Sequence, residues 1–192
     1  DTRMSSTTEP RAGGASTLHS QAAAAKATTR RLAAASTREK NAALTAMADA
    51  LLRATPRILE ANCVDVDAAA MRGQTAALVD RLCLTEARVA QIAEGVRQIA
   101  ALPDPVGRIE RLEARPNGLR VGRMTVPLGL VGIVYEARPN VTIDAAALCL
   151  KSGNACLLRG GSEALASNRA LVSVVGDALA SAGLPREAVS FV

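Results

Sequence analysis

The spacing of hydrophobic positions predicts a helical first half of the chain. Between residues 21 and 107, apolar side chains recur every three or four residues, which is typical of helices with one buried face. The stripes are Leu44, Met47, Ala48 and Leu51, then Leu59, Cys63, Val66 and Ala70, and then Val89, Ile92, Ala93, Val96 and Ile99. We therefore expect residues 21–107 to form a helical lead-in that packs against one side of a later sheet.

After residue 126 the pattern changes to short apolar runs that alternate with helices. The run 130–135 is too brief for an independent helix and rich in β-branched residues, which favours a strand buried on both faces. Thr142 is the predicted N-cap of the next helix. Further strands are expected at residues 155–158 and 188–192, with a second helix between them. This β-α-β-α-β order predicts an α/β fold with an open parallel sheet, whose ligands lie beyond the carboxyl ends of the strands.

Two other segments complete the predicted organisation. Residues 1–20 are rich in Ser, Thr, Gly and Arg, and we expect them to form a disordered tail. Residues 108–126 alternate irregularly around Asn117-Gly118, which predicts a β-hairpin closed by a tight type I′ turn. Residues 127–192 are then the nucleotide-binding part. We expect this part to be incomplete, because its last predicted strand would leave an unpaired apolar edge.

Composition excludes several classes of function. The formal net charge is +5, but the basic residues are spread along the chain, and one Tyr, one Phe and no Trp leave nothing to stack on bases. We therefore expect no nucleic-acid binding. The four cysteines have no zinc-binding spacing, so we interpret them as buried small residues in a reducing cytosol and predict no metal site. The sequence shows neither a signal peptide nor a run of apolar residues that could span a membrane, which predicts a soluble, cytoplasmic protein.

The loop after the second predicted strand carries residues suited to a dinucleotide. Arg159 ends that strand, where an arginine accommodates the 2′-phosphate of NADPH in nucleotide-binding sheets. Gly160 and Gly161 would let the backbone approach a ligand, and the N–H groups of Ser162 and Glu163 would receive an anion. A simple strand-to-helix turn with a solvated arginine remains the alternative, since the G-x-G-x-x-G fingerprint is absent.

Both loops and their neighbours carry a family resemblance. The segments are Tyr135-Glu136-Ala137-Arg138-Pro139-Asn140-Val141-Thr142, Leu148-Cys149-Leu150-Lys151-Ser152-Gly153-Asn154-Ala155 and Leu158-Arg159-Gly160-Gly161-Ser162-Glu163-Ala164. They closely resemble the gamma-glutamyl phosphate reductases of the aldehyde dehydrogenase superfamily. The resemblance extends from about residue 20 to the end of the chain. It implies an aldehyde dehydrogenase-like cofactor domain, whose hairpin joins the subunits of a homo-oligomer.

The resemblance also implies an activity. Members of this family reduce L-glutamyl 5-phosphate to L-glutamate 5-semialdehyde and phosphate with NADPH, in proline biosynthesis, which further implies a functional association with glutamate 5-kinase. A cysteine displaces the phosphate to give a thioester. None of the four cysteines here matches the motif of that nucleophile. We therefore expect the catalytic domain to be absent from this chain, and the chain alone to be inactive.

Two residues of the first loop acquire roles from the same resemblance. Asn140 occupies the place of the asparagine whose amide stabilises the oxyanion during catalysis. Its alternative role is that of a helix-entry residue that satisfies backbone amides. Arg138 would meet the acyl phosphate or a substrate carboxylate, and its alternative is an ion pair with Glu136.

Two other readings of the chain remain open. One is another oxidoreductase of the aldehyde dehydrogenase superfamily, acting on a different aldehyde or acyl donor. The other is a non-catalytic short form that binds nucleotides or serves in assembly. The first predicts turnover without the specific requirement for phosphate, whereas the second predicts a stable chain with no cysteine-dependent turnover.

Overall fold

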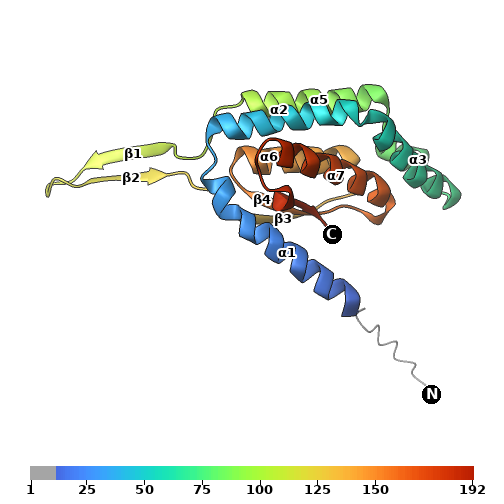
Figure 1. Cartoon of the computed structure of the whole chain (residues 1–192), viewed down its shortest axis with the longest axis horizontal. Coiled ribbons are helices and arrows are strands. Elements are labelled where there is room, and N and C mark those ends of the chain that lie inside the picture. Colours follow the sequence, from blue (N-terminus) through green and yellow to red (C-terminus); the bar gives the residue numbers. More distant parts are fainter. Residues whose placement is uncertain (1–11) are drawn as a thin grey trace, which may run out of the picture.

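A three-stranded parallel sheet lies at the centre of the chain, of which the computed structural model describes the backbone of residues 12–192 and the side chains of residues 17–192. Helices cover both of its faces (Figure 1). One face is covered by α6 (Pro139–Lys151) and α7 (Leu165–Ser181), on which α2 (Thr37–Arg53) and α5 (Glu86–Ala101) form an outer layer, and the other face by α1 (Ala12–Ala33). The expected lead-in therefore packs mainly on α6 and α7, and α1 is the part of it that packs on the strands of the sheet.

The sheet confirms the predicted β-α-β-α-β order. Its strands are β3 (Leu130–Val134), β4 (Ala155–Arg159) and β5 (Val189–Phe191), in the spatial order β3-β4-β5. In the register, Val134 pairs with Arg159, so the two candidate loops leave the sheet side by side. The prediction that the first strand, β3, is buried on both faces is wrong. On the face of the sheet opposite α6 and α7, α1 covers only part of the surface, and Val134 is 84% exposed.

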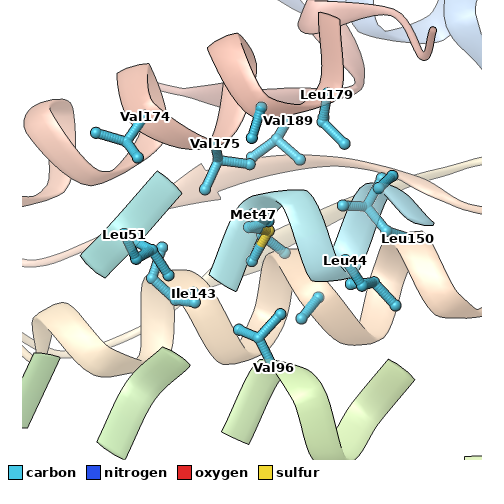
Figure 2. Packing of buried hydrophobic residues seen from close by; sticks show 14 of the residues in the cluster. Leu44, Met47, Leu51, Val96, Ile143, Leu150, Val174, Val175, Leu179 and Val189 are labelled. Carbon is cyan, nitrogen blue, oxygen red and sulfur yellow. The ribbon is translucent and has the colours of Figure 1, made fainter. Parts of the chain in front are cut away.

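A single large apolar core joins the helical lead-in to the sheet. Figure 2 shows Met47 of α2 surrounded by side chains from α5, α6 and α7, including Val96, Ile143 and Val175. All four of these side chains are at least 95% buried. The stripe predicted for α2 is confirmed, since its members are all buried. The stripe predicted for α5 is confirmed except at its end, where Ala100 is buried and Ile99 only half-buried.

The predicted buried face of α3 (Thr55–Met71) is wrong by one position. The residues that α3 buries are Ile58, Asn62, Asp65 and Ala69. Asn62 and Asp65 are polar, so a search for apolar periodicity passes over this face. Their side chains are hydrogen-bonded to α7, to the end of α4 (Ala76–Leu82) and to the segment that follows α4.

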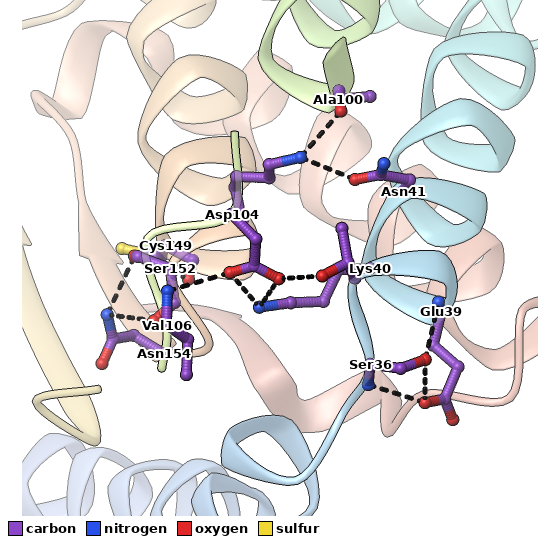
Figure 3. Close-up of polar contacts among 12 residues, drawn as sticks. Ser36, Glu39, Lys40, Asn41, Ala100, Asp104, Val106, Cys149, Ser152 and Asn154 are labelled. Carbon is purple, nitrogen blue, oxygen red and sulfur yellow. Dashed lines mark hydrogen bonds and ion pairs between the residues drawn. The ribbon is translucent and has the colours of Figure 1, made fainter. Parts of the chain in front are cut away.

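Buried charged groups join α2 to the segment that leads into the hairpin (Figure 3). The Lys40 ammonium contacts both carboxylate oxygens of Asp104, at 2.7 and 2.6 Å, and its side chain is only 2% exposed. Burial acts to raise the pKa of Asp104, but hydrogen bonds from Lys40, Thr37 and the Val106 amide, with the Lys40 charge, hold it below its ordinary value. The carboxylate offsets the cost of removing this ammonium from water.

The hairpin predicted at residues 108–126 is confirmed as an antiparallel pair, β1 (Ile109–Ala114) and β2 (Arg120–Met124). It projects from the body, and every residue of both strands is exposed (Figure 1). The predicted type I′ turn is wrong. That turn needs positive φ at both central residues, whereas here Gly118 has a φ of 84° and Asn117 is not in the left-handed region. The structure has a longer loop, in which the Gly118 amide donates to the Arg115 carbonyl.

The structure also differs from the predicted tail at residues 1–20. Residues 1–11 lie outside the described part of the chain, and residues 12–20 are helical because α1 begins at Ala12. The Ala-rich run downstream favours helix, and helix propagation extends it through the Ser and Thr residues that suggested disorder.

Candidate functional site

The loops that follow β3 and β4 touch each other at the carboxyl edge of the sheet. A Cβ atom on Gly161 would lie 2.9 Å from the backbone nitrogen of Ala137. A Cβ atom on Gly160 would overlap the Asn168 amide and press on the Tyr135 ring. Neither glycine has a positive φ, so the close approach of the chain to itself requires them.

The helix after β3 begins earlier than predicted. Arg138 is the N-cap and Pro139 occupies the first turn, where its fixed φ suits a helix. The predicted N-cap, Thr142, is instead fully buried within α6. Its hydroxyl lies 2.6 Å from the Tyr135 hydroxyl and donates to the Asn168 side-chain oxygen at 2.6 Å. This start places Asn140 in the first turn of α6, with its side chain exposed.

Asn140 faces a pocket of about 450 Å³ between α6 and the α4–α5 connection. Its side chain hydrogen-bonds to Asp144, one turn further along α6. Burial raises the pKa of Asp144, and the hydrogen bond from Asn140 only partly offsets this. The side-chain amide of Asn140 is thus directed along the pocket wall, and no bond from it to a backbone amide is found in the described residues.

Arg138 forms the ion pair that was the alternative to a substrate contact. Its Nε lies 3.2 Å from a carboxylate oxygen of Glu136, and the two side chains are 45% and 75% exposed. Exposed pairs of this kind contribute only about 0 to 1 kcal/mol. Because Arg138 also borders the pocket that holds Asn140, the weak pair leaves its guanidinium available to an anion there.

Arg159 lies at the carboxyl end of β4, as predicted, and its side chain is exposed. Its Nη1 donates to the Val192 carbonyl at 3.0 Å. Beside it is a pocket of about 780 Å³ between α1 and the open face of the sheet. Leu18, Val134 and Phe191 give this pocket an apolar lining. An arginine at the rim of an apolar pocket suits a ligand with an aromatic ring and a phosphate.

The residues after Gly161 offer backbone donors. Ser162 and Glu163 open a short 3-10 helix, and no acceptor for their N–H groups is found within the part of the chain that the structure describes. The N–H groups of Ala166 and Ser167, by contrast, donate to the Asp65 carboxylate at 3.1 and 2.7 Å. An acidic side chain therefore already occupies the α7 N-terminus, and the donors left for a phosphate are those of Ser162 and Glu163.

The contacts that hold this loop were not predicted from the sequence. Asp65 also accepts from the Ser167 hydroxyl at 2.6 Å. Asn62 donates to that hydroxyl at 3.0 Å and to the Leu82 carbonyl at 2.9 Å. These partners are far apart along the chain, so no local pattern reveals them. The available signal was a pair of polar residues three positions apart, at a spacing that places both on one face of the helix.

The cysteines divide between surface and core. Cys63 is exposed and Cys83 is half-buried at the wall of the Asn140 pocket, so the expectation that all four are buried is wrong for these two. Cys149 and Cys156 are buried, and contact with Cys149 together with burial raises the pKa of the Cys156 thiol. Among the described residues, no group of acidic, His or Cys side chains could hold a metal ion, and no helix is long and apolar enough to cross a membrane.

The fold places the chain in a known structural class. An acetylating aldehyde dehydrogenase from Geobacillus thermoglucosidasius superposes with a TM-score of 0.70 and 19% identity, over 92% of this chain and 36% of the other. At this identity the likeness concerns the fold alone, which is that of an aldehyde dehydrogenase. No protein-family model matches the chain.

Within that class the chain is similar to gamma-glutamyl phosphate reductase. The protein of that name from Clostridium novyi is 50% identical over 171 residues. The structure of the enzyme from Thermotoga maritima matches with a TM-score of 0.89 and 43% identity, over 91% of this chain. The resemblance predicted from the loop sequences is therefore confirmed. The chain spans 41% of the length of the first relative and 42% of the second.

Proposed function

We propose that the complete protein containing this sequence is a gamma-glutamyl phosphate reductase. It reduces L-glutamyl 5-phosphate to L-glutamate 5-semialdehyde and releases phosphate, as a step of proline biosynthesis in the cytoplasm. The observation that carries the proposal is 50% identity to a protein of that name over 89% of the chain. The two loops whose motifs support it lie in contact at one edge of the sheet.

NADPH is the proposed cofactor, and it would supply the hydride for the reduction. Arg159 would meet its 2′-phosphate, and the N–H groups of Ser162 and Glu163 would donate to another of its phosphates. Support comes from the exposed guanidinium at the end of β4 and from the absence of an acceptor for these two amides within the described residues. Gly160 and Gly161 would act by keeping this loop against the first one.

Asn140 is the proposed oxyanion donor. Its side-chain amide would stabilise the charge that develops on the substrate oxygen, and such a donor is worth about 3 to 4 kcal/mol. Arg138 is proposed to meet the phosphate of the substrate. The nucleophilic cysteine that the resemblance implies is assigned to a catalytic domain outside residues 1–192, so this chain alone is expected to be inactive.

The hairpin is proposed to join the subunits of a homo-oligomer. Its strands expose large apolar side chains, and an isolated two-stranded hairpin is at best marginally stable in water. The exposed members are Ile109, Leu112, Val121 and Met124. A functional association with glutamate 5-kinase is a further part of this proposal, because that enzyme makes the acyl phosphate.

The activity can be measured in the reverse direction with the complete protein. Glutamate 5-semialdehyde, phosphate and NADP⁺ should give L-glutamyl 5-phosphate and NADPH, followed by absorbance of the reduced cofactor. We expect the rate to require phosphate. Oxidation of simple aldehydes without phosphate would instead indicate another aldehyde dehydrogenase, and nucleotide binding with no turnover would indicate a non-catalytic protein.

A further inference from the structure

The pocket beside Asn140 has charged residues of both signs on its walls. Arg81 of α4 and Asp144 of α6 line it together with Asn140, and its volume is about 450 Å³. We propose that this pocket binds the amino-acid head group of the substrate, with Asp144 accepting from the α-ammonium and Arg81 donating to the α-carboxylate. The inference rests on the proposed function and assigns the residues that select a glutamyl substrate.

Asp144 has no cationic partner in the described part of the chain. It takes part in none of the ion pairs there, and its neighbour Asn140 is neutral. The side chain is half-buried, and burial raises its pKa. A carboxylate withdrawn from water without a counter-charge is costly, and a ligand ammonium would remove that cost.

Arg81 is the arginine of this pocket whose guanidinium is free. Arg88 donates to the Cys83 carbonyl at 2.7 Å and to the Asp80 carboxylate at 2.9 Å, so it is held in place by the end of α4. Arg138 forms a weak pair with Glu136 and is already proposed to meet the phosphate at the reacting end of the substrate, so it is not assigned to the head group. No hydrogen bond or ion pair of the Arg81 side chain is found among the described residues, although it lines the pocket. A free guanidinium suits a carboxylate, which it can bind through two parallel hydrogen bonds.

The spacing along α6 matches the length of a glutamyl chain. Asn140 and Asp144 are four residues apart in α6, so their side chains lie on one face with Cβ atoms about 5 to 6 Å apart. In a glutamyl substrate three carbon–carbon bonds separate the reacting carbon from the carbon that carries the ammonium, a span of about 4 Å. The oxyanion can therefore lie at Asn140 while the ammonium reaches Asp144.

The test uses four aldehydes that share the reacting end and differ in the head group. Glutamate 5-semialdehyde carries both charges, 5-oxopentanoate lacks the ammonium, 4-aminobutanal lacks the carboxylate, and butanal lacks both. Each is oxidised with phosphate and NADP⁺ by the complete protein. Because Asp144 also accepts a hydrogen bond from Asn140, its substitution can slow all four reactions by one common factor. Beyond that common factor, we expect Asp144→Asn to lower kcat/KM about 10- to 100-fold more for the two aldehydes with an ammonium than for 5-oxopentanoate and butanal.

Arg81→Gln should show the complementary pattern. Its kcat/KM should fall by a similar factor for glutamate 5-semialdehyde and 5-oxopentanoate, and stay unchanged for 4-aminobutanal and butanal. The matched controls are Asp67→Asn and Arg72→Gln, because both residues are exposed on or beside α3 and line none of the pockets described above. The controls should behave as the wild type with all four aldehydes.

Two results would overturn the inference, and they differ in what they say about the activity. An equal loss with all four aldehydes, or no loss at all, in variants of an otherwise active protein would remove the head-group role and leave the reductase activity standing. A wild-type protein without phosphate-dependent oxidation of glutamate 5-semialdehyde would overturn the proposed function, and the inference with it. Thermal unfolding of each variant identifies losses that come from misfolding.

Discussion

Gly161 lies so close to Ala137 that there is no room for a side chain between them, although the two residues belong to loops that follow different strands. Ala137 precedes the residues proposed to bind substrate, and Gly161 precedes those proposed to bind the cofactor. A Cβ atom on Gly161 would lie 2.9 Å from the Ala137 nitrogen and 3.0 Å from its Cβ. The two loops can therefore keep their relative position only while position 161 has no side chain.

Gly161→Ala is expected to destabilise the protein by about 1 to 3 kcal/mol, because backbone atoms must move to admit the methyl group. Gly95→Ala is the matched control, since nothing lies within 4 Å of a Cβ there and the residue is inside α5. The free energy of unfolding of this control should rise by about 0.4 to 1 kcal/mol. Urea unfolding measures both changes, and equal stability of the two variants would contradict the close approach.

Arg159→Ala should discriminate between the two nicotinamide cofactors. We expect the Kd for NADPH to rise about 10- to 100-fold, as for loss of a charge-assisted hydrogen bond, while the Kd for NADH changes little. Fluorescence titration of the complete protein measures both constants. Arg53→Ala, at the exposed end of α2, is the control. Equal weakening of both cofactors would remove the 2′-phosphate role.

Asn140→Ala should slow turnover about 100- to 1,000-fold with little effect on cofactor affinity, because its amide would act on the developing oxyanion. Steady-state kinetics with glutamate 5-semialdehyde measure the first quantity and cofactor titration the second. Asn117→Ala in the exposed hairpin loop should leave turnover unchanged. A variant at position 140 with wild-type turnover would return this residue to a purely structural role.

Removing one partner of the buried Lys40–Asp104 pair should lower the free energy of unfolding far more than replacing both partners. Asp104→Ala leaves the Lys40 ammonium buried without a counter-charge, and we expect a loss of about 3 to 5 kcal/mol. The double variant Lys40→Met, Asp104→Leu should recover most of that loss, as similar apolar replacements do. Chemical denaturation decides the matter, and additive losses in the double variant would count against this account.

Acid should remove the contribution of the Lys40–Asp104 pair to the stability of the fold. The pKa of Asp104 in the folded protein lies below its ordinary value of 3.8. Its ionised form therefore stabilises the fold above pH 3.8, and this stabilisation disappears as the pH falls from there through the lowered pKa. The wild type should lose stability in this interval more steeply than the double variant. Parallel pH profiles would contradict the lowered pKa.

Local signals in the sequence were enough to predict the order of the elements. The short apolar run before Tyr135, Gly153 after α6 and Gly183 after α7 act within a few residues, and each corresponds to a boundary of the structure. The start of α6, which carries Asn140, was predicted less well. The α6 start was assigned to Thr142 because a threonine favours an N-cap, whereas the preference of Pro139 for the first turn determined it.

The parts that could not be predicted depend on residues distant in sequence. Asp65 is buried because the α7 N-terminus supplies the N–H groups that it needs, and those belong to residues 166 and 167. The pattern of apolar and polar positions along the chain cannot distinguish a polar residue that is buried with a distant partner from one that is exposed to solvent. The same argument applies to Lys40, whose burial depends on Asp104.

The contact between Asp65 and Ser167 also has a consequence for the folding of the chain. It closes a loop of 102 residues, and formation of so distant a contact is slow compared with local helix formation. Helices α2, α3 and α5 share one core with α6 and α7, so neither half has a finished interior alone. The boundary near residue 107 thus separates two sequence patterns within one cooperative folding unit, and synthesis of the first half gives no completed domain.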